Sequence, residues 1–447
     1  MAWDEKARKA MSERSAGARN VIASGLSRCR LSITRALGTL DLLVEKEIRH
    51  NLFSYKFAII TVLTTLLILV STYVMYRDYC LAQENYEILR SESEEAAVVI
   101  PPTPLSIFAK GLDADLCRSY EVGGTNIGVS SKQQSMNKVF RLFTTPDLLY
   151  VIKIVLSLCA MLFAFDMISG EKEAGTLRQA LGSSLRRPLL ILAKWICGFT
   201  SFILPLFLAV LLSTAFVSLQ PRVAMSPQDW ARLGLFLLSS VVYLAVFFSL
   251  GLLISCLTHQ PSSSLVVSLS VWTLLVFLIP NLGNVLAREL VELPTVQQLE
   301  LARTYSYRRE RFESRGVDRS EWFRLRARAR KESDQLAEDY RNRFNRLVAV
   351  SQNITRISPA AAFTFLASDI MGTGVAEERR LKSAILQYSH SVREWGSGRA
   401  RPVFRYQRST CRETLAQGGL GNLLILMLFG MLSCAGAYVA FLRYDVR

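Results

Sequence analysis

The segment FAIITVLTTLLILVSTYVMY, residues 57–76, contains no charged side chain. A helix rises about 1.5 Å per residue, so about 20 apolar residues cross the ~30 Å hydrocarbon core of a bilayer. Every backbone N–H and C=O in that core must be hydrogen-bonded within the protein, and a helix achieves this within one segment. The stretch therefore predicts a membrane-spanning helix.

Five further apolar runs have a similar length, and they cover residues 148–165, 196–219, 233–257, 265–280 and 420–442. A buried helix of a soluble protein can imitate one such run, but not six. The runs predict an all-α polytopic membrane protein with six transmembrane helices. The N-terminus lacks the short apolar core and cleavage site of a secretory signal, so we expect the whole chain to be the mature protein.

The charges beside the runs predict the orientation, because Lys and Arg near a span are retained in the cytosol. Residues 1–56 contain eleven Lys or Arg and six acidic residues, and residues 166–194 contain five and three. Both segments should be cytosolic. Residues 77–147 contain seven bases and ten acids and should form an extracytoplasmic loop. Six crossings then return the C-terminus to the cytosol.

Residues 286–417 contain 25 Lys or Arg against 16 acids, although the number of crossings places them outside the cell. Long loops are translocated largely regardless of charge, so we still expect an extracytoplasmic domain there. Its polar, helix-favouring sequence predicts a helical domain with two antiparallel helices at its start. The basic surface could attract lipid phosphate or an acidic protein, and a solvated helical face explains it equally well. Nucleic acid is not expected as a partner on that side.

Residues 40–55, LDLLVEKEIRHNLFSY, combine an apolar stripe at helical spacing with a charged opposite side. This pattern predicts a helix lying in the membrane interface directly before the first span. The alternative is a cytosolic extension of that span, but its apolar stripe would then face water.

Cysteine and histidine usage gives no metal pattern, since the eight Cys and three His include no CxxC motif and no Cys/His cluster. Cys80 and Cys117 share the first outer loop and could form a disulfide in an oxidising compartment.

Motifs for catalysis and for energy conversion are also missing from the sequence. There is no GxxxxGK[ST] phosphate-binding loop, HExxH or GxSxG motif. An ion-coupled carrier usually has ionisable groups deep in the membrane. Here Lys153, Asp166 and Lys194 lie near the ends of spans, where they can reach the interface. We therefore expect no catalytic, cofactor-binding or metal site, and the sequence disfavours an ion-coupled carrier.

The connection between the second and third spans, FDMISGEKEAGTLRQALGSSLRRPLLILAKW at residues 165–195, is charged and favours a helix. Acidic residues come early in it and basic residues late, which suits the helix dipole. We expect Glu171–Glu173 to begin a polar helix that Thr176–Leu181 continue. A rigid helix here could pass the movement of a bound partner to both attached spans.

The sequence GEKEAGTL, followed by Arg187 and Lys194–Trp195, resembles the cytosolic signature after the second span of ABC-2 type ABC-transporter permeases. Residues 40–55 are similar to the elbow helix of these proteins, with Glu45, Lys46, Glu47 and Arg49 on it. The resemblance implies that one set of residues docks on a separate ATP-binding subunit: Gly170, Glu171, Lys172, Glu173, Gly175, Thr176, Leu177, Arg187 and Lys194. SSLRRP departs from the proline-containing turn that the family often has before the Arg.

The long insert before the last span resembles a bacterial subgroup with a large extracytoplasmic region. By this resemblance the chain is a permease subunit in the bacterial inner membrane, with a second permease copy or a paralogue. The partner ATPase would bind ATP and magnesium, and its hydrolysis would drive export or a transmembrane conformational change. An extracytoplasmic protein partner is a further implication. The alternative is a membrane-anchored scaffold whose outer helical domain binds a partner without transport.

Overall fold

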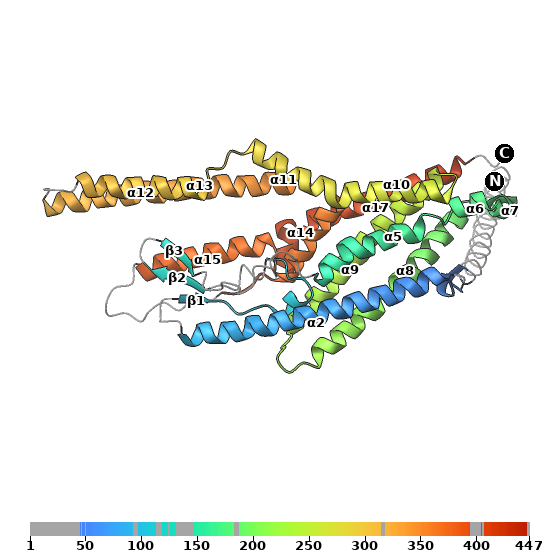
Figure 1. Cartoon of the computed structure of the whole chain (residues 1–447), viewed down its shortest axis with the longest axis horizontal. Coiled ribbons are helices and arrows are strands. Elements are labelled where there is room, and N and C mark those ends of the chain that lie inside the picture. Colours follow the sequence, from blue (N-terminus) through green and yellow to red (C-terminus); the bar gives the residue numbers. More distant parts are fainter. Residues whose placement is uncertain are drawn as a thin grey trace, which may run out of the picture.

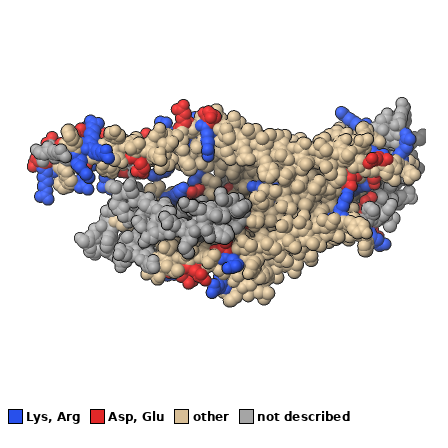
Figure 2. Space-filling model, viewed as in Figure 1, with Lys and Arg blue, Asp and Glu red and all other residues tan. Residues whose placement is uncertain are grey.

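The computed structural model describes the following residues: 45, 47–49, 51–92, 97–112, 119–123, 126–130, 146–182, 187–313, 318–393, 404 and 406–444. Most helices run along the long axis of the molecule (Figure 1). We name its two ends after the elements found there, the α6 end and the α12 end. Lys, Arg, Asp and Glu gather toward these ends in the view of Figure 2, and a largely uncharged band separates them.

Within the described residues, six helices are long and apolar enough to span a membrane, which confirms the predicted all-α polytopic membrane protein. Two of them are interrupted by short π-helices, η3 and η4. The six are α2 (Tyr55–Glu92), α4–η3–α5 (Leu148–Tyr150, Val151–Leu156, Ser157–Ala164), α8 (Arg187–Ser218), α9 (Pro227–Leu257), α10–η4–α11 (Pro261–Thr273, Leu274–Leu278, Ile279–Leu290) and α17 (Leu420–Leu442).

Helix α2 is much longer than the apolar run that predicted it. It continues from Tyr76 to Glu92 through an acidic sequence. No Gly or Pro occurs between Tyr55 and Glu92, so nothing in the sequence ends the helix at the membrane boundary. The segment 77–147 thus begins as a helical extension of the first span.

Helix α9 lies at the centre of the bundle and packs against α5, α17 and α14 (Pro359–Met371), while α2 packs along α8. Tyr243 of α9 is fully buried and stacks on Phe363, with ring centroids 4.3 Å apart. Its hydroxyl donates to the carbonyl of Lys153 at 2.8 Å. Helices α2, α10 and α17 are the least buried spans and turn large apolar faces outward, as lipid-facing helices do.

At the α12 end, α12 (Val296–Glu313) and α13 (Arg319–Thr355) form an antiparallel hairpin that projects far from the bundle (Figure 1). Helix α14 returns the chain to the bundle, and α15 (Val375–Arg393) leaves it again. The chain reaches α17 through α16 (Cys411–Thr414) and the π-helix η5 (Leu415–Gly419).

The segment after α2 contains a three-stranded antiparallel sheet that the sequence did not predict. Its order is β1 (Ala97–Val99), β2 (Ser119–Gly123), β3 (Asn126–Ser130). Strands of three to five residues are too short to show a recognisable alternation of apolar and polar residues. Val98 and Ile100 pack against Leu381 and Ile385 of α15, which ties the sheet to the helical domain.

The proline-rich stretch between β1 and β2 forms the short 3-10 helix η1 (Pro104–Ile107). Leu105, Ile107 and Phe108 are completely buried, so this part of segment 77–147 is packed against the bundle. The possible disulfide between Cys80 and Cys117 is not tested, because Cys117 lies outside the described residues; the Cys80 thiol is free in the structure.

Candidate functional site

The connection between α5 and α8 lies at the α6 end and contains two short helices, α6 (Ser169–Glu173) and α7 (Thr176–Gly182), which we call the α6–α7 linker. The predicted uninterrupted helix is wrong. The chain bends at Gly175, whose φ of +71° lies in the left-handed region. Its amide donates to the carbonyl of Lys172 at 3.2 Å, closing the end of α6. Glycine adopts this conformation without the strain of a Cβ atom, which explains the break.

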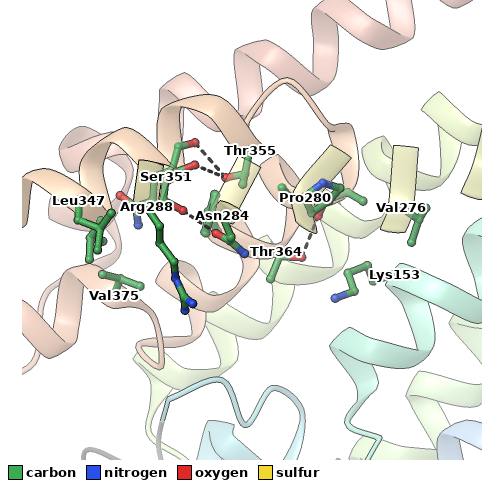
Figure 3. Close-up of a pocket in the computed structure, with 15 residues that line it drawn as sticks. Lys153, Val276, Pro280, Asn284, Arg288, Leu347, Ser351, Thr355, Thr364 and Val375 are labelled. Carbon is green, nitrogen blue, oxygen red and sulfur yellow. Dashed lines mark hydrogen bonds between the residues drawn. The ribbon is translucent and has the colours of Figure 1, made fainter. Parts of the chain in front are cut away.

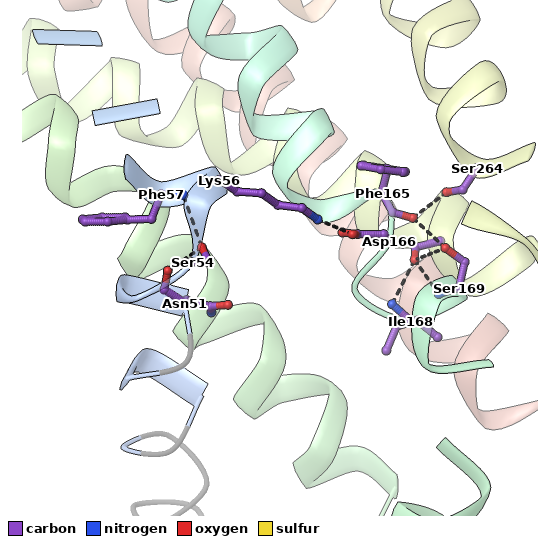
Figure 4. Close-up of polar contacts among 10 residues, drawn as sticks. Asn51, Ser54, Lys56, Phe57, Phe165, Asp166, Ile168, Ser169 and Ser264 are labelled. Carbon is purple, nitrogen blue, oxygen red and sulfur yellow. Dashed lines mark hydrogen bonds and ion pairs between the residues drawn. The ribbon is translucent and has the colours of Figure 1, made fainter. Parts of the chain in front are cut away.

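The start of α6 is bound to the ends of two other spans (Figure 4). The hydroxyl oxygen of Ser255, near the end of α9, accepts hydrogen bonds from the amides of Ile168 and Ser169, both at 3.0 Å. Ser264 of α10 donates its hydroxyl to the carbonyl of Phe165 at 2.6 Å. These bonds satisfy backbone groups that a helix terminus leaves without partners. They also bind α5, α6, α9 and α10 to one another.

An ion pair adds the first span to this junction. Lys56, in the first turn of α2, pairs with Asp166 directly after α5 (Figure 4). The Lys56 ammonium also lies 5.4 Å from the centre of the Phe165 ring. The beginning of α2 is therefore held beside the beginning of the linker.

Lys172 binds the end of α9 rather than pointing away from the protein. Its Nζ donates to the carbonyls of Cys256 and Thr258, the latter at 2.8 Å. The ring of Tyr444, just beyond α17, lies 4.8 Å from the same ammonium. The last carbonyls of a helix lack intrahelical donors and carry partial negative charge, so a cation stabilises them.

Lys194 is almost completely buried, with 4 % of its surface exposed. Its Nζ lies 2.7 Å from Oε1 of Glu171 in the linker and 3.5 Å from Oε1 of Glu47, which precedes α2. A buried ammonium is costly unless it is paired, and here two carboxylates from different segments surround it. Helix α8, the linker and the segment before α2 meet at this one charge.

Arg187, the first residue of α8, caps another span. Its Nη1 donates to the carbonyls of Leu442 and Tyr444, both at 3.2 Å, at the end of α17. The resemblance implied that Lys172, Arg187 and Lys194 face a partner subunit. In the structure their charged groups bind atoms of their own chain.

A different set of residues forms the exposed edge of the linker. Leu177 is 1 % exposed and fixes α7 to the bundle. The exposed residues around it are Glu173, Ala174, Gly175, Thr176, Arg178 and Gln179. Gly170 lies inside α6 and is half-buried. Only part of the predicted set is thus accessible to a docking protein.

The predicted elbow region is described in part. Glu45 and residues 47–49 are helical, Glu45 pairs with Arg49 at 2.9 Å in an exposed ion pair, and Lys46 lies outside the described residues. The helix is interrupted at residues 53–54. There the Ser54 hydroxyl oxygen accepts from the amide of Phe57 at 3.2 Å and caps α2 (Figure 4). The segment is therefore separate from the first span.

A family model described as an ABC-2 family transporter protein matches residues 42–446. The chain belongs to the ABC-2 transporter family. It is accordingly a multi-pass membrane permease of an ABC transporter, a class that works with an ABC ATP-binding subunit. No match was found among curated proteins.

The residues that hold the linker in place, Ser255 and Ser264 among them, were not predicted from the sequence. Ser255 and Ser264 lie in or beside apolar runs, LLISCL and PSSSLVV, where a hydroxyl has few hydrogen-bond partners. A polar side chain at the end of an apolar run could have predicted these contacts, because such a group needs a hydrogen-bond partner from another segment. Lys56 and Asp166 gave the same signal, since both lie at ends of spans.

Proposed function

We propose that the α6–α7 linker is the coupling segment of this permease and docks on a separate ATP-binding subunit. One observation carries the proposal: the junction around the linker binds the ends of α2, α8, α9, α10 and α17, while one edge of the linker stays exposed. A subunit that grips this edge would act on all of these spans together. The α6 end then faces the cytosol, and the α12–α13 hairpin lies outside the cell.

The contacts of α6 with the end of α9 suggest how movement of the partner would reach the spans. The partner would hold ATP and Mg²⁺ and change its shape during hydrolysis. The α6 helix would move with the partner, and Lys172 and Ser255 would carry the end of α9 with it. Since α9 packs against α5, α14 and α17, its displacement would reach the opposite end of the bundle. The partner biases the spans between two arrangements only by contacting them differently in each.

Export is the transport direction that we propose, in a bacterial inner membrane with both termini in the cytosol. A second permease copy or a paralogue would cover part of the apolar faces of α2, α10 and α17, and lipid would cover the rest. An extracytoplasmic protein would have access to the exposed α12–α13 hairpin.

A matched pair of double variants tests the docking role. Glu173→Arg with Thr176→Arg changes two exposed residues of the linker, and Glu300→Arg with Thr304→Arg changes two exposed residues of α12. The chain is co-purified with its ATPase, and the stimulation of ATP hydrolysis is measured. We expect the linker variant to lose association at least about tenfold, a loss typical of residues central to an interface. The α12 variant should behave as wild type, and the opposite pattern would rule out the coupling role.

The orientation has its own test with the same two positions. Thr176→Cys and Thr304→Cys are treated on intact cells with a membrane-impermeant thiol reagent, with the parent chain as background. We expect labelling at position 304 and none at 176 until the cells are opened. Labelling at 176 from the outside would overturn the proposed topology and, with it, the docking of a cytosolic ATPase.

A further inference from the structure

A cavity of about 440 Å³ lies where the membrane bundle meets the outer helices (Figure 3). This volume is within the range of small-molecule sites in proteins. Five parts of the chain line it: η3, the η4–α11 segment, α13, α14 and the start of α15. The lining residues used below are Lys153, Val276, Pro280, Asn284, Arg288 and Phe365.

Two cations line this cavity from different helices, Lys153 from η3 and Arg288 from α11. No carboxylate among the described residues lies within ion-pair distance of either one. Asp147, the acidic residue nearest to Lys153 in the sequence, forms no ion pair with it. Its carboxylate oxygens already accept the amides of Tyr150, at 2.7 Å, and Lys110, at 2.9 Å. An ammonium among apolar helices is retained where it has a counter-charge, and a bound anion would supply it.

Polar and apolar side chains both line the cavity, and Lys153 lies near Val276 while Asn284 lies nearer to Arg288 (Figure 3). Asn284 accepts a hydrogen bond from the Ser351 hydroxyl at 2.6 Å, which leaves its amide NH₂ as a further donor near Arg288. Val276, Pro280 and Phe365 contribute apolar surface to the lining. Two cations, an amide donor and apolar surface in one cavity suit an amphiphilic ligand.

The depth of these residues in the membrane supports the same chemistry. The fifth span starts at Pro261, at the α6 end. At 1.5 Å per residue, Val276 lies ~23 Å along it and Arg288 ~40 Å, compared with a hydrocarbon core of ~30 Å. Val276 thus lies at the depth of acyl chains, and Arg288 at the depth of head groups on the far side of the membrane.

We infer that this cavity binds the anionic head group of a single-chain amphiphile, a phosphate or a carboxylate held by Lys153 and Arg288. Its chain lies along Val276, Pro280 and Phe365. The ligand is a lipid of the far leaflet or a cargo of the same chemistry. The cargo alternative rests on the proposed function, because a cargo site at this junction would change shape when the coupling segment moves the bundle. The lipid alternative does not depend on it.

The binding test uses the full chain in detergent without its ATPase. Native mass spectrometry compares lysophosphatidic acid with lysophosphatidylcholine, which shares the chain but carries no net charge. We expect the wild type to prefer the anionic probe. Lys153→Met and Arg288→Gln should each weaken its binding about tenfold, as expected for one charge-assisted hydrogen bond. Arg308→Gln, an exposed cation on α12, is the matched control and should change nothing.

Lys153→Arg keeps the charge and should restore binding, which separates loss of the site from loss of the fold. Equal binding of both probes by the wild type, or unchanged binding by both pocket variants, would overturn the inference. Because the ATPase is absent, a failure of the coupling proposal leaves this result unaffected. When the ATPase is added, release of the probe on ATP hydrolysis identifies a cargo site, and retention identifies a lipid site.

Discussion

The α6 end and the α12–α13 hairpin are both rich in charged residues, but they use them in opposite ways. At the α6 end, Lys172, Arg187 and Lys194 bind carbonyls or carboxylates of distant segments of their own chain. On the hairpin, a pair such as Arg309–Glu313 joins two exposed side chains one turn apart on the same helix. Composition alone does not distinguish these cases, and the position of each partner does.

This difference has an energetic meaning. The half-buried Lys172 and Arg187 bind carbonyls at helix ends that have no intrahelical donor, so removing either cation leaves those acceptors without this partner. An exposed pair exchanges one solvated contact for another and contributes little. We therefore propose that the α6 end is a fixed joint that transmits movement, and that the hairpin is a solvated surface that tolerates change and can meet a partner.

Lys172→Met gives the largest expected effect, because it removes the cation that binds the carbonyls of Cys256 and Thr258 while keeping the chain length. We expect the unfolding free energy in detergent to fall by about 3 kcal/mol, since hydrogen bonds to a charged group are worth about 1.5–3 kcal/mol each. Stimulation of the ATPase should fall as well, even where the two subunits still associate.

The matched control is Lys382→Met on α15, which removes the ammonium of the exposed pair with Glu378 at 2.6 Å. Its loss should cost less than about 1 kcal/mol. If Lys172→Met and Lys382→Met lost the same unfolding free energy, the α6 end would be no more firmly fixed than the exposed surface.

Gly175→Ala tests the bend between α6 and α7. A Cβ atom there would meet nothing within 4 Å, so space is not the obstacle. The obstacle is the φ of +71°, which costs an L-residue roughly 1–2 kcal/mol. We expect a loss of that size in thermal unfolding, together with weaker coupling to the ATPase.

Gly182→Ala is the control for this bend, because it also has open space around the added Cβ but lies at the end of α7 without a positive φ. Alanine favours a helix more than glycine does, so this variant should be neutral or slightly stabilising. If both glycine variants behaved alike, the bend would not be a fixed feature of the linker.

Asp369 of α14 is an exception at the α12 end, because this carboxyl is partly buried. Burial raises its pKa to about 6, although the amide of Ala376 and the nearby Arg356 and Arg379 oppose the shift. The unfolded chain binds the proton only below about pH 4, so between pH 7 and pH 4 the folded state binds more protons than the unfolded state. The unfolding free energy should therefore rise as the pH falls, by about 1 kcal/mol from pH 7 to pH 5.

The comparison of wild type with Asp369→Asn isolates this group from other titrating residues. The amide oxygen of Asn can still accept the hydrogen bond from Ala376, and it does not ionise. We expect the difference between pH 7 and pH 5 to shrink by that amount in thermal unfolding followed in detergent. An unchanged difference would show that Asp369 is ionised at both pH values, as an exposed carboxylate is.

The sequence was sufficient for the six spans, since an uncharged run such as residues 57–76 has few alternatives to a membrane helix. It was insufficient for the ends of those helices. The extension of α2 to Glu92 depends on packing and on the absence of a stop signal, and hydropathy reports neither. The sheet β1–β2–β3 depends on pairing between segments that are separated in the chain, which a local pattern does not contain.

The candidate site shows the same limit at the level of single residues. The linker was identified by its charges and its resemblance to a family, but the direction of each side chain was not. Lys172 and Glu173 are neighbours in the sequence, yet one binds the end of α9 and the other is exposed. Only the fold decides which of two adjacent charges lies against a helix end, so the division between anchoring and docking residues required the structure.

Arg309→Gln on the hairpin gives the smallest expected effect. The guanidinium lies 2.9 Å from Glu313, and both side chains are largely exposed, so the pair should contribute less than about 0.5 kcal/mol. Thermal unfolding and ATPase stimulation should both match the wild type. A loss of unfolding free energy comparable to that of Lys172→Met would mean that the hairpin charges stabilise the fold as much as those of the α6 end. The hairpin would then be a structural strut, and its exposure would no longer support a role in binding an extracytoplasmic partner.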